Sequence, residues 1–345
     1  MPIAVLLSAL SGGVATAQQA PVPSTTYTRP HTLVAVDGIR RLNLFCQGSG
    51  TPTVLLDAGA GENMMVWRHV QGQLASLTRT CSYDRAGYGF SDAATRRSDA
   101  SAAVDDVHRL IQTAIHAPVV YVGHSLAGIY GTLLVATHPT DVSGVVLVDP
   151  SFFNQFALTS ASFTPAERTG LAGLLDQGLG QLRSCLALAR SGALAKPATK
   201  DAAACVDSKG YADTTIDAAL RREVERQNGL ATHLTTALSE YGSFWPNASG
   251  QIIDDQQVAA AGIDFGDRPL VVLTRGKAQR SFPSVSAAHM AANDSAWTAG
   301  HVALAARSTR GTHLVIPNTE HHIQFDQPSA VIDAVRQVVM QVRRM

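Results

Sequence analysis

The chain has 345 residues, of which 46% are hydrophobic and 16% charged, so it is long enough to bury a large core in one or two domains. Its 27 Lys and Arg residues balance 27 Asp and Glu residues, which gives a net charge of zero. This balance excludes the basic excess of nucleic-acid-binding proteins and of polybasic membrane surfaces, so we expect neither nucleic acid nor stable membrane insertion.

The first 17 residues have the composition of a secretory signal peptide. The apolar stretch 3–10 is too short to span a bilayer, and a small-residue cleavage site, Ala15-Thr16-Ala17, follows it. We predict cleavage after Ala17 and hence a secreted or periplasmic protein; the alternative is a buried helix of the mature fold. Residues 18–30 contain three prolines and several Ser and Thr residues, which predicts a flexible lead-in.

Short apolar strands alternate with helical stretches along most of the remaining chain. The first two strands flank the turn dipeptide Asp37-Gly38 and predict an antiparallel hairpin. Strands are expected at 32–36, 41–46, 53–56, 79–83, 119–122, 144–148, 270–274 and 313–316. Helices are expected at about 65–77 and 100–114, after Ser125, and from Pro328. This alternation predicts a mostly parallel sheet wrapped by helices.

A long segment without a convincing strand interrupts this alternation. It begins a helix at Thr164-Pro165, where a hydroxyl cap precedes a proline, and its middle is rich in Leu, Ala and Gly. We predict a helical cap over residues 152–259, inserted between core segments 31–151 and 260–345. Four apolar side chains are candidates for lining a substrate pocket: Met64, Tyr241, Phe244 and Trp245. The three aromatic ones could equally anchor the cap to the core.

The sequence Gly123-His124-Ser125-Leu126-Ala127-Gly128 follows a strand and precedes a helix. A serine on such a sharp turn is exposed, and backbone N–H groups lie close to it, as a serine nucleophile requires. The common pattern GxSxG would place its second glycine at Ala127, whereas this chain has Gly128. A GxS triplet alone equally describes an ordinary strand-to-helix turn.

Four motifs in the expected order give the chain a resemblance to the α/β-hydrolase superfamily over about residues 31–151 and 260–345. They are the turn at Ser125, the glycine-containing loop 56–61, the segment 84–92 that is similar to DRxGxGxS, and the histidine loop 319–328. The resemblance implies an α/β fold with a mostly parallel eight-stranded sheet flanked by helices, and the cap inserted after strand 6. In the segment 84–92 we expect a structural Asp84–Arg85 pair.

The resemblance also implies roles for particular residues. Ser125 would be the nucleophile, and the backbone N–H groups of Ala60 and Leu126 would form the oxyanion hole. Counting back from Pro328 selects His321 as the base. Its neighbour His322 also suggests a metal site, but no third histidine has ligand spacing, so we predict neither a metal nor a cofactor.

The acid of the predicted triad is ambiguous. Many members of the superfamily have an Asp after strand 7, where this chain has Thr274 and Arg275. Asp149 ends strand 6, and the carboxyl ends of both strands lie at the edge of the sheet where ligands bind. We predict Asp149 as the acid, with Asp294 and Asp264 as alternatives; Asp149 could instead cap the turn at Pro150.

Four cysteines are compatible with two disulfides in an oxidising compartment, and three pairings are possible. They lack the CxxC spacing of a zinc site. The architecture implied by the resemblance brings the strands of Cys46 and Cys81 together, which predicts the pair Cys46–Cys81. The second pair would then be Cys185–Cys205, within the cap.

The sequence therefore predicts a secreted serine hydrolase that cleaves a small, apolar carboxylic ester, without a cofactor. Ser125 argues against dehalogenases and epoxide hydrolases of this superfamily, which have a carboxylate nucleophile. Lactones, thioesters, amides and C–C bonds remain possible substrates of the same triad. A ligand-binding module of the same fold is the non-enzymatic alternative, and the sequence does not predict the oligomeric state.

Overall fold

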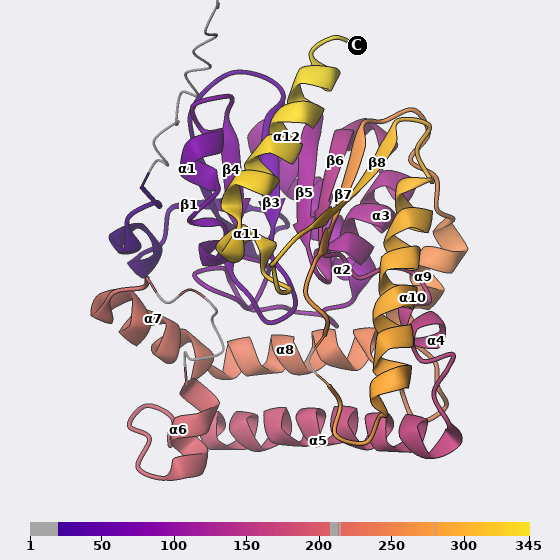
Figure 1. Ribbon diagram of the computed structural model, residues 1–345. Helices are drawn as coiled ribbons and strands as arrows, with labels where there is room; N and C mark the ends of the chain where they lie inside the picture. Colours follow the sequence, from indigo (N-terminus) through magenta and orange to yellow (C-terminus); the bar gives the residue numbers. More distant parts are fainter. Residues whose placement is uncertain (1–19, 208–212, 214, 280) are drawn as a thin grey trace, which may run out of the picture.

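The computed structural model describes residues 20–345 except 208–212, 214 and 280, so the predicted signal peptide lies outside the described residues. An eight-stranded sheet in the order β1-β2-β4-β3-β5-β6-β7-β8 forms the centre of the molecule (Figure 1). Its strands are β1 Thr32–Ala35, β2 Arg41–Gln47, β3 Thr53–Asp57, β4 Thr80–Tyr83, β5 Val119–His124, β6 Val142–Val148, β7 Leu270–Arg275 and β8 Gly311–Ile316. The β1–β2 and β2–β4 pairs are antiparallel and the others parallel, which confirms the predicted fold class.

Helices cover both faces of the sheet because its central strands are apolar on both sides. In β5, Val119 and Tyr121 face one hydrophobic cluster, and Val120 and Val122 face the other. The first cluster includes side chains of α2 Ala100–Leu110, α3 Ala127–Thr137 and α10 Ala287–Ala305. The second includes those of α1 Gln71–Leu74 and α12 Pro328–Val342. Two further short helices, η2 Met64–Trp67 and α11 Ile323–Asp326, lie in the connections that follow β3 and β8.

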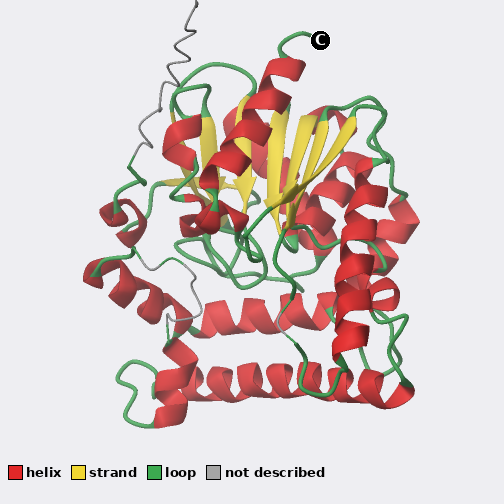
Figure 2. Cartoon of the chain, in the orientation of Figure 1, coloured by secondary structure: helices red, strands yellow, loops and turns green. Residues whose placement is uncertain are grey.

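Between β6 and β7 the structure describes six helices joined by loops. These helices are α4 Gln155–Thr159, α5 Pro165–Arg190, α6 Lys200–Val206, α7 Ala218–Asn228, α8 Ala231–Phe244 and α9 Ile253–Ala261. A capping box of Thr164 and Glu167 begins α5. Helices α5 and α8 run side by side beyond the edge of the sheet where the parallel strands end (Figures 1 and 2). Val258 of α9 instead packs in the core cluster next to α2 and α3.

The segment predicted as a flexible lead-in is packed in the structure from residue 20 onward. It contains the short helix η1 Ser24–Thr28, and Val22 and Tyr27 are each 3% exposed. Met64 is also buried in this cluster, together with Leu220 of α7. Residues 18 and 19 of the predicted lead-in lie outside the described residues, and from residue 20 onward Val22 and Tyr27 contribute side chains to a buried apolar cluster.

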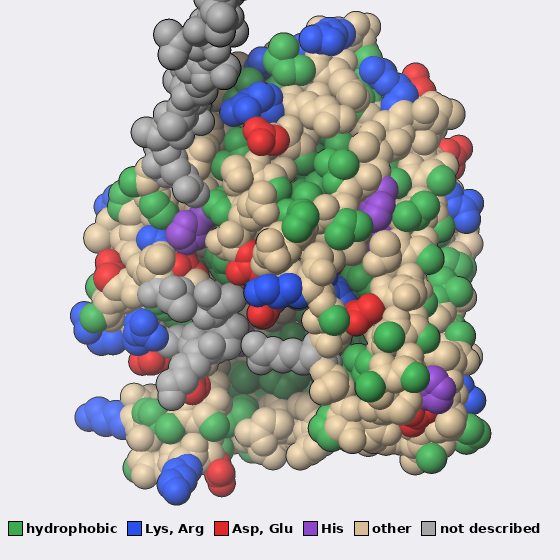
Figure 3. Space-filling view, viewed as in Figure 1, with side chains coloured by type: hydrophobic (Ala, Val, Ile, Leu, Met, Phe, Trp, Pro, Cys, Tyr) green, Lys and Arg blue, Asp and Glu red, His purple; other side chains and the backbone are tan. Residues whose placement is uncertain are grey.

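Both predicted disulfides are present. Cys46 and Cys81 lie opposite each other on the antiparallel strands β2 and β4, with Cα atoms 4.0 Å apart. Cys185 and Cys205 join α5 to α6, with Cα atoms 5.5 Å apart. Among the described residues, no helix has both the length and the apolar character needed to cross a bilayer. On the face shown in Figure 3, Lys and Arg side chains and Asp and Glu side chains are scattered among uncharged ones.

Candidate active site

Ser125 lies at the sharp turn between β5 and α3. Its backbone φ is 54°, a left-handed conformation that is rare outside glycine. The turn is close-packed, since a Cβ atom on Gly123 would lie 2.7 Å from the carbonyl oxygen of Ala127. A Cβ atom on Gly128 would lie 2.4 Å from Pro150, so this glycine is required where α3 meets the end of β6. The neighbouring Ala127 is fully buried.

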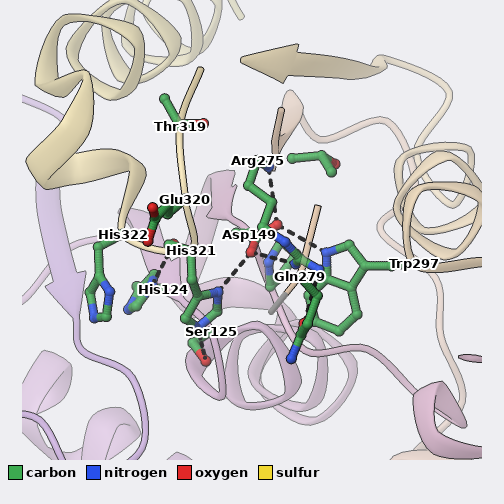
Figure 4. Close-up of polar contacts among 12 residues, drawn as sticks. His124, Ser125, Asp149, Arg275, Gln279, Trp297, Thr319, Glu320, His321 and His322 are labelled. Carbon is green, nitrogen blue, oxygen red and sulfur yellow. Dashed lines mark hydrogen bonds and ion pairs between the residues drawn. The ribbon is translucent and has the colours of Figure 1, made fainter. Parts of the chain in front are cut away.

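His321 connects Ser125 to Asp149. It lies in the loop between β8 and α11, and its Nε2 is 2.9 Å from Ser125 Oγ (Figure 4). Its Nδ1 is 2.7 Å from Asp149 Oδ2. The carboxylate can only accept, so Nδ1–H donates to it and Nε2 is left free to accept the serine hydroxyl proton. This arrangement can move a proton from a hydroxyl group to an imidazole.

Asp149 follows β6 and is completely buried, with a backbone φ of 40°. Besides His321, it accepts hydrogen bonds from the Arg275 backbone N–H (3.1 Å), Arg275 Nη1 (2.9 Å) and Trp297 Nε1 (3.0 Å). Burial opposes its charge, but the hydrogen bond and charge of His321 and the charge of Arg275 outweigh burial and hold the pKa of Asp149 below its usual range.

The two alternative acids lie elsewhere. Asp294 of α10 contacts Arg275 Nη2 at 3.3 Å and the Gln279 backbone N–H at 3.0 Å. Asp264 is exposed and accepts a hydrogen bond from the Gly266 backbone N–H at 2.7 Å. The structure therefore brings Asp149, rather than Asp294 or Asp264, to His321.

The loop that follows β3 holds Ala60 close to Ser125. A Cβ atom on Gly59 would lie 2.6 Å from Glu62 Oε2, 2.9 Å from His124 Nδ1 and 3.1 Å from Ser125 Cβ, so glycine is needed at this position. The N–H groups on either side of Ala60 are fixed, since Gly59 donates to Glu62 Oε2 (2.7 Å) and Gly61 donates to Glu240 Oε2 (3.1 Å).

Arg85 holds the carbonyl groups of the same loop. It donates to the carbonyl oxygens of Ala58 and Gly59, each at 2.5 Å, and its ion pairs with Asp57 and Glu240 are both 2.9 Å. Glu240 was not predicted, because it lies on α8 and belongs to no motif.

The predicted Asp84–Arg85 pair was wrong. Asp84 accepts hydrogen bonds from the Asn43 side chain and from the backbone N–H groups of Met64 and Phe90. These three donors bind both oxygens of its carboxylate, and Arg85 turns instead toward the loop after β3.

A second polar group, Glu62, His124 and His322, lies beside His321. Glu62 Oε1 is 2.6 Å from His322 Nε2, and Glu62 Oε2 is 3.0 Å from His124 Nδ1. Burial opposes the charge of Glu62, but the attraction of His124 and His322 outweighs burial and lowers the pKa of Glu62. Burial also opposes the charge of His322, and the attraction of Glu62 outweighs it and raises the pKa of His322. Burial lowers the pKa of His124, whose Nε2 lies 3.1 Å from the His321 carbonyl oxygen.

Two groups in the described part of the chain have potential ligand atoms within 4.8 Å of one another: Glu62, His124 and His322, and His108, His138 and Asp141. In the first, the hydrogen bonds given above already pair each ligand atom. In the second, the His108 and His138 rings are stacked with centroids 3.9 Å apart and planes at 13°, so their in-plane lone pairs do not converge on one point.

Of the four residues predicted to line a pocket, the three aromatic ones are neighbours on and after α8, and Met64 lies apart from them. Tyr241 lies over the loop after β3, with its hydroxyl 3.4 Å from the Ala60 carbonyl oxygen, and its ring packs on Trp245. Phe244 packs against the core next to Phe156, with ring centroids 5.5 Å apart. Met64 is buried away from them under residues 22–27, so the structure does not place it with the aromatic residues.

A groove of about 750 Å³ lies between α4, α5, α9 and the loop after α8. Apolar side chains that line it include Phe153, Phe156, Leu171, Leu175 and Ile252. Ser125, His321 and Asp149 do not belong to its lining, although Phe156 links it to Phe244.

Comparison with known proteins matches residues 54–334 to the model of the alpha/beta hydrolase family. The curated relatives are matched over about half of their length or less. YqjL, an uncharacterized protein of Bacillus subtilis, is 26% identical over 38% of this chain and 51% of its own length. Mouse epoxide hydrolase 4 is 25% identical over 32% of each chain.

Solved structures with the same fold include epoxide hydrolase CorEH, with a TM-score of 0.59 and 17% identity over 90% of this chain and 98% of its own. A thermophilic esterase of Thermogutta terrifontis has a TM-score of 0.52 and 16% identity over 90% of this chain and 97% of its own. At these identities the likeness concerns the fold alone.

Proposed function

We propose, from the premise that this chain belongs to the alpha/beta hydrolase family, that it is a serine hydrolase that cleaves carboxylic esters through an acyl-enzyme. The observation that carries the proposal is the continuous contact from Ser125 Oγ to His321 (2.9 Å) and from His321 to the buried Asp149 (2.7 Å). A serine becomes nucleophilic when a base within hydrogen-bond distance accepts its proton and a third group orients that base.

In the proposed reaction, His321 Nε2 takes the Ser125 proton while Oγ attacks the ester carbonyl carbon. The oxyanion accepts hydrogen bonds from the backbone N–H groups of Ala60 and Leu126, and Asp149 stabilises the imidazolium. The tetrahedral species collapses, and the alcohol leaves with the proton from His321. Water then attacks the acyl carbon as His321 takes its proton, and collapse releases the carboxylic acid and restores Ser125.

The side chain at the turn after β5 distinguishes this proposal from epoxide hydrolysis. The relatives and solved structures named as epoxide hydrolases match this chain at 28% identity or less. The superfamily's epoxide hydrolases use a carboxylate nucleophile, whereas this turn carries Ser125. We therefore assign this chain to ester hydrolysis, with Tyr241, Phe244 and Trp245 as the aromatic wall that receives an apolar substrate.

Export from the cytoplasm is part of the proposal. The disulfides Cys46–Cys81 and Cys185–Cys205 support it, because such bonds persist in oxidising compartments.

A fluorophosphonate probe, which phosphonylates activated serines, tests the proposal without knowledge of the substrate. We expect the wild-type protein to be labelled and Ser125→Ala to be unlabelled, with ester hydrolysis reduced by about 10⁴-fold or more. Ser295→Ala, on the exposed face of α10, is the matched control and should be labelled like the wild type.

An unlabelled native protein that still binds a ligand would contradict the proposal and favour the ligand-binding module. Once labelling is established, a panel of acyl esters of rising chain length, aryl esters, lactones, thioesters and amides identifies the substrate class. We expect esters to be the fastest of these, and faster hydrolysis of another class would replace the ester assignment while leaving the triad in place.

A further inference from the structure

Arg275, at the end of β7, forms an ion pair with Asp149. Arg275 Nη1 is 2.9 Å from Asp149 Oδ2, the same oxygen that lies 2.7 Å from His321 Nδ1. The backbone N–H of Arg275 also donates to Asp149 Oδ1 at 3.1 Å. His321 and Arg275 therefore share one carboxylate oxygen (Figure 4).

Packing fixes the guanidinium in this position. The Arg275 side chain is 6% exposed, and its Cζ lies 4.8 Å from the centre of the Trp297 ring. Its Nη2 donates to Gln279 Oε1 at 3.0 Å and contacts Asp294 Oδ1 at 3.3 Å. The indole Nε1 of Trp297 donates to Asp149 Oδ1, so the same ring orients both members of the ion pair.

The charge of Arg275 has a direct consequence for His321. A carboxylate next to an imidazole favours the protonated ring, whereas a nearby guanidinium disfavours it. We infer that Arg275 is a positioning residue that offsets the charge of Asp149 and so disfavours protonation of His321, the proposed base; this inference rests on the proposed function.

Other titratable groups face His321 and Asp149 from three elements. From the turn after β5 comes His124, whose ring centroid is 4.7 Å from that of His321 and whose pKa burial lowers. From the loop before α11 comes His322, which is paired with Glu62. From α10 comes His301, a buried ring that contacts Thr274 and the Pro150 carbonyl oxygen.

Burial lowers the pKa of His301 to about 4, so this ring is neutral near pH 6. The Glu62–His322 pair balances its own charge. The charged groups next to His321 are thus Asp149 and Arg275, which form an ion pair. Asp294 contacts the other end of the same guanidinium.

The test measures the rate of fluorophosphonate labelling of the full chain between pH 4 and 9. The rate should rise with pH as His321 loses its proton, and the midpoint of this rise is the readout. Arg275→Gln should move the midpoint upward by about one pH unit, because a full charge next to a buried site shifts a titration by that order. Arg275→Lys retains the charge and should keep the midpoint within about 0.3 units of the wild type on the same basis.

Two further variants separate charge from geometry. Asp294→Asn leaves the guanidinium less compensated and should move the midpoint slightly downward, opposite to Arg275→Gln. Trp297→Phe removes a neutral hydrogen bond to Asp149 and should lower the rate several-fold at every pH, with a smaller midpoint shift than Arg275→Gln.

The outcomes are distinguishable. An unlabelled wild-type protein would overturn the proposed function itself. A labelled wild type with the same midpoint in Arg275→Gln, even at a uniformly reduced rate, would reduce Arg275 to a structural role and overturn this inference alone. If Arg275→Gln does not fold, Asp294→Asn tests the inference in its place. A midpoint in Asp294→Asn that is unchanged or higher than that of the wild type would contradict the inference.

Discussion

Two buried arginines stand on either side of Ser125 at the same edge of the sheet. Arg85 follows β4 and Arg275 ends β7, and each of these strands lies two positions away from β5 in the sheet order. Their side chains are 7% and 6% exposed, and each is bound by two carboxylates, Asp57 and Glu240 for Arg85 and Asp149 and Asp294 for Arg275.

The two sites differ in what the guanidinium touches. Arg85 contacts carbonyl oxygens of the loop that carries Ala60, and Glu240 links it to helix α8 of the cap. Arg275 contacts the carboxylate that binds His321. A buried charge can therefore organise a site in two ways, by fixing backbone positions or by adjusting the charge of a group in the reaction. Substitutions at the Arg85 site should act equally at every pH, whereas those at the Arg275 site should depend on pH.

The largest expected effect distinguishes the two carboxylates that pair with Arg275, those of Asp149 and Asp294. Asp149→Asn should lower kcat by about 10⁴-fold, because an amide cannot stabilise the imidazolium or hold the correct tautomer. Asp294→Asn should retain most of the wild-type turnover, since Asp294 touches Arg275 and not His321. Steady-state ester hydrolysis by both variants checks this, and equal turnover in the two would remove Asp149 from the mechanism.

The next effect tests whether the Arg85 site is structural. Glu240→Gln leaves Arg85 buried beside a single carboxylate, and breaking such a pair costs about 3–5 kcal/mol. We expect this loss in the free energy of unfolding measured with urea, together with a lower kcat at every pH between 5 and 9.

The matched control for this experiment is Tyr88→Phe, which removes a 2.7 Å hydrogen bond to Glu240 but no charge. Its cost should be smaller, on the order of 1–3 kcal/mol, as for a lost hydrogen bond to a charged group. A pH-dependent loss of activity in Glu240→Gln would break the contrast with Arg275.

The sheet and the contacts of Ser125 and His321 followed from the sequence because they depend on local patterns. Alternation of apolar runs with turns determines where strands begin, and strand order then places the ends of β5 and β8 at one edge. The disulfide Cys46–Cys81 followed for the same reason, since it needs only two adjacent strands.

The two arginine sites could not be predicted, because their partners are distant in the chain and carry no motif. Glu240 is 155 residues from Arg85, on a helix whose apolar pattern does not reveal which face meets the core. At the end of β7 the sequence showed only that a carboxylate was missing; that Arg275 would bind Asp149 depends on packing against Trp297. Burial of Val22 and Tyr27 likewise depends on a surface formed by residues far along the chain.

A buried carboxylate without an arginine sharpens the comparison and carries the smallest expected effect. Asp254 of α9 is 1% exposed; its Oδ1 accepts the Ala100 backbone N–H at 2.9 Å, and its Oδ2 has no hydrogen-bond partner within the described structure. Burial raises the pKa of Asp254 to about 7, because the single hydrogen bond from Ala100 does not compensate it. Burial without a cation thus has the opposite result to that at Asp149.

The sign of the pH dependence follows from this pKa. The unfolded carboxyl titrates near pH 4, so the protonated Asp254 adds stability that is fully present below about pH 4 and is lost as the pH rises through 7. Asp254→Asn does not titrate and should be more stable than the wild type at pH 8 by on the order of 1–4 kcal/mol, with a much smaller difference at pH 5. Urea unfolding at both pH values measures this, and Asp255→Asn, on the adjacent and less buried side chain, should show a weaker change. If Asp254→Asn were equally destabilised at pH 5 and pH 8, Asp254 would be ionised in the folded protein, and burial without an arginine would not govern its charge.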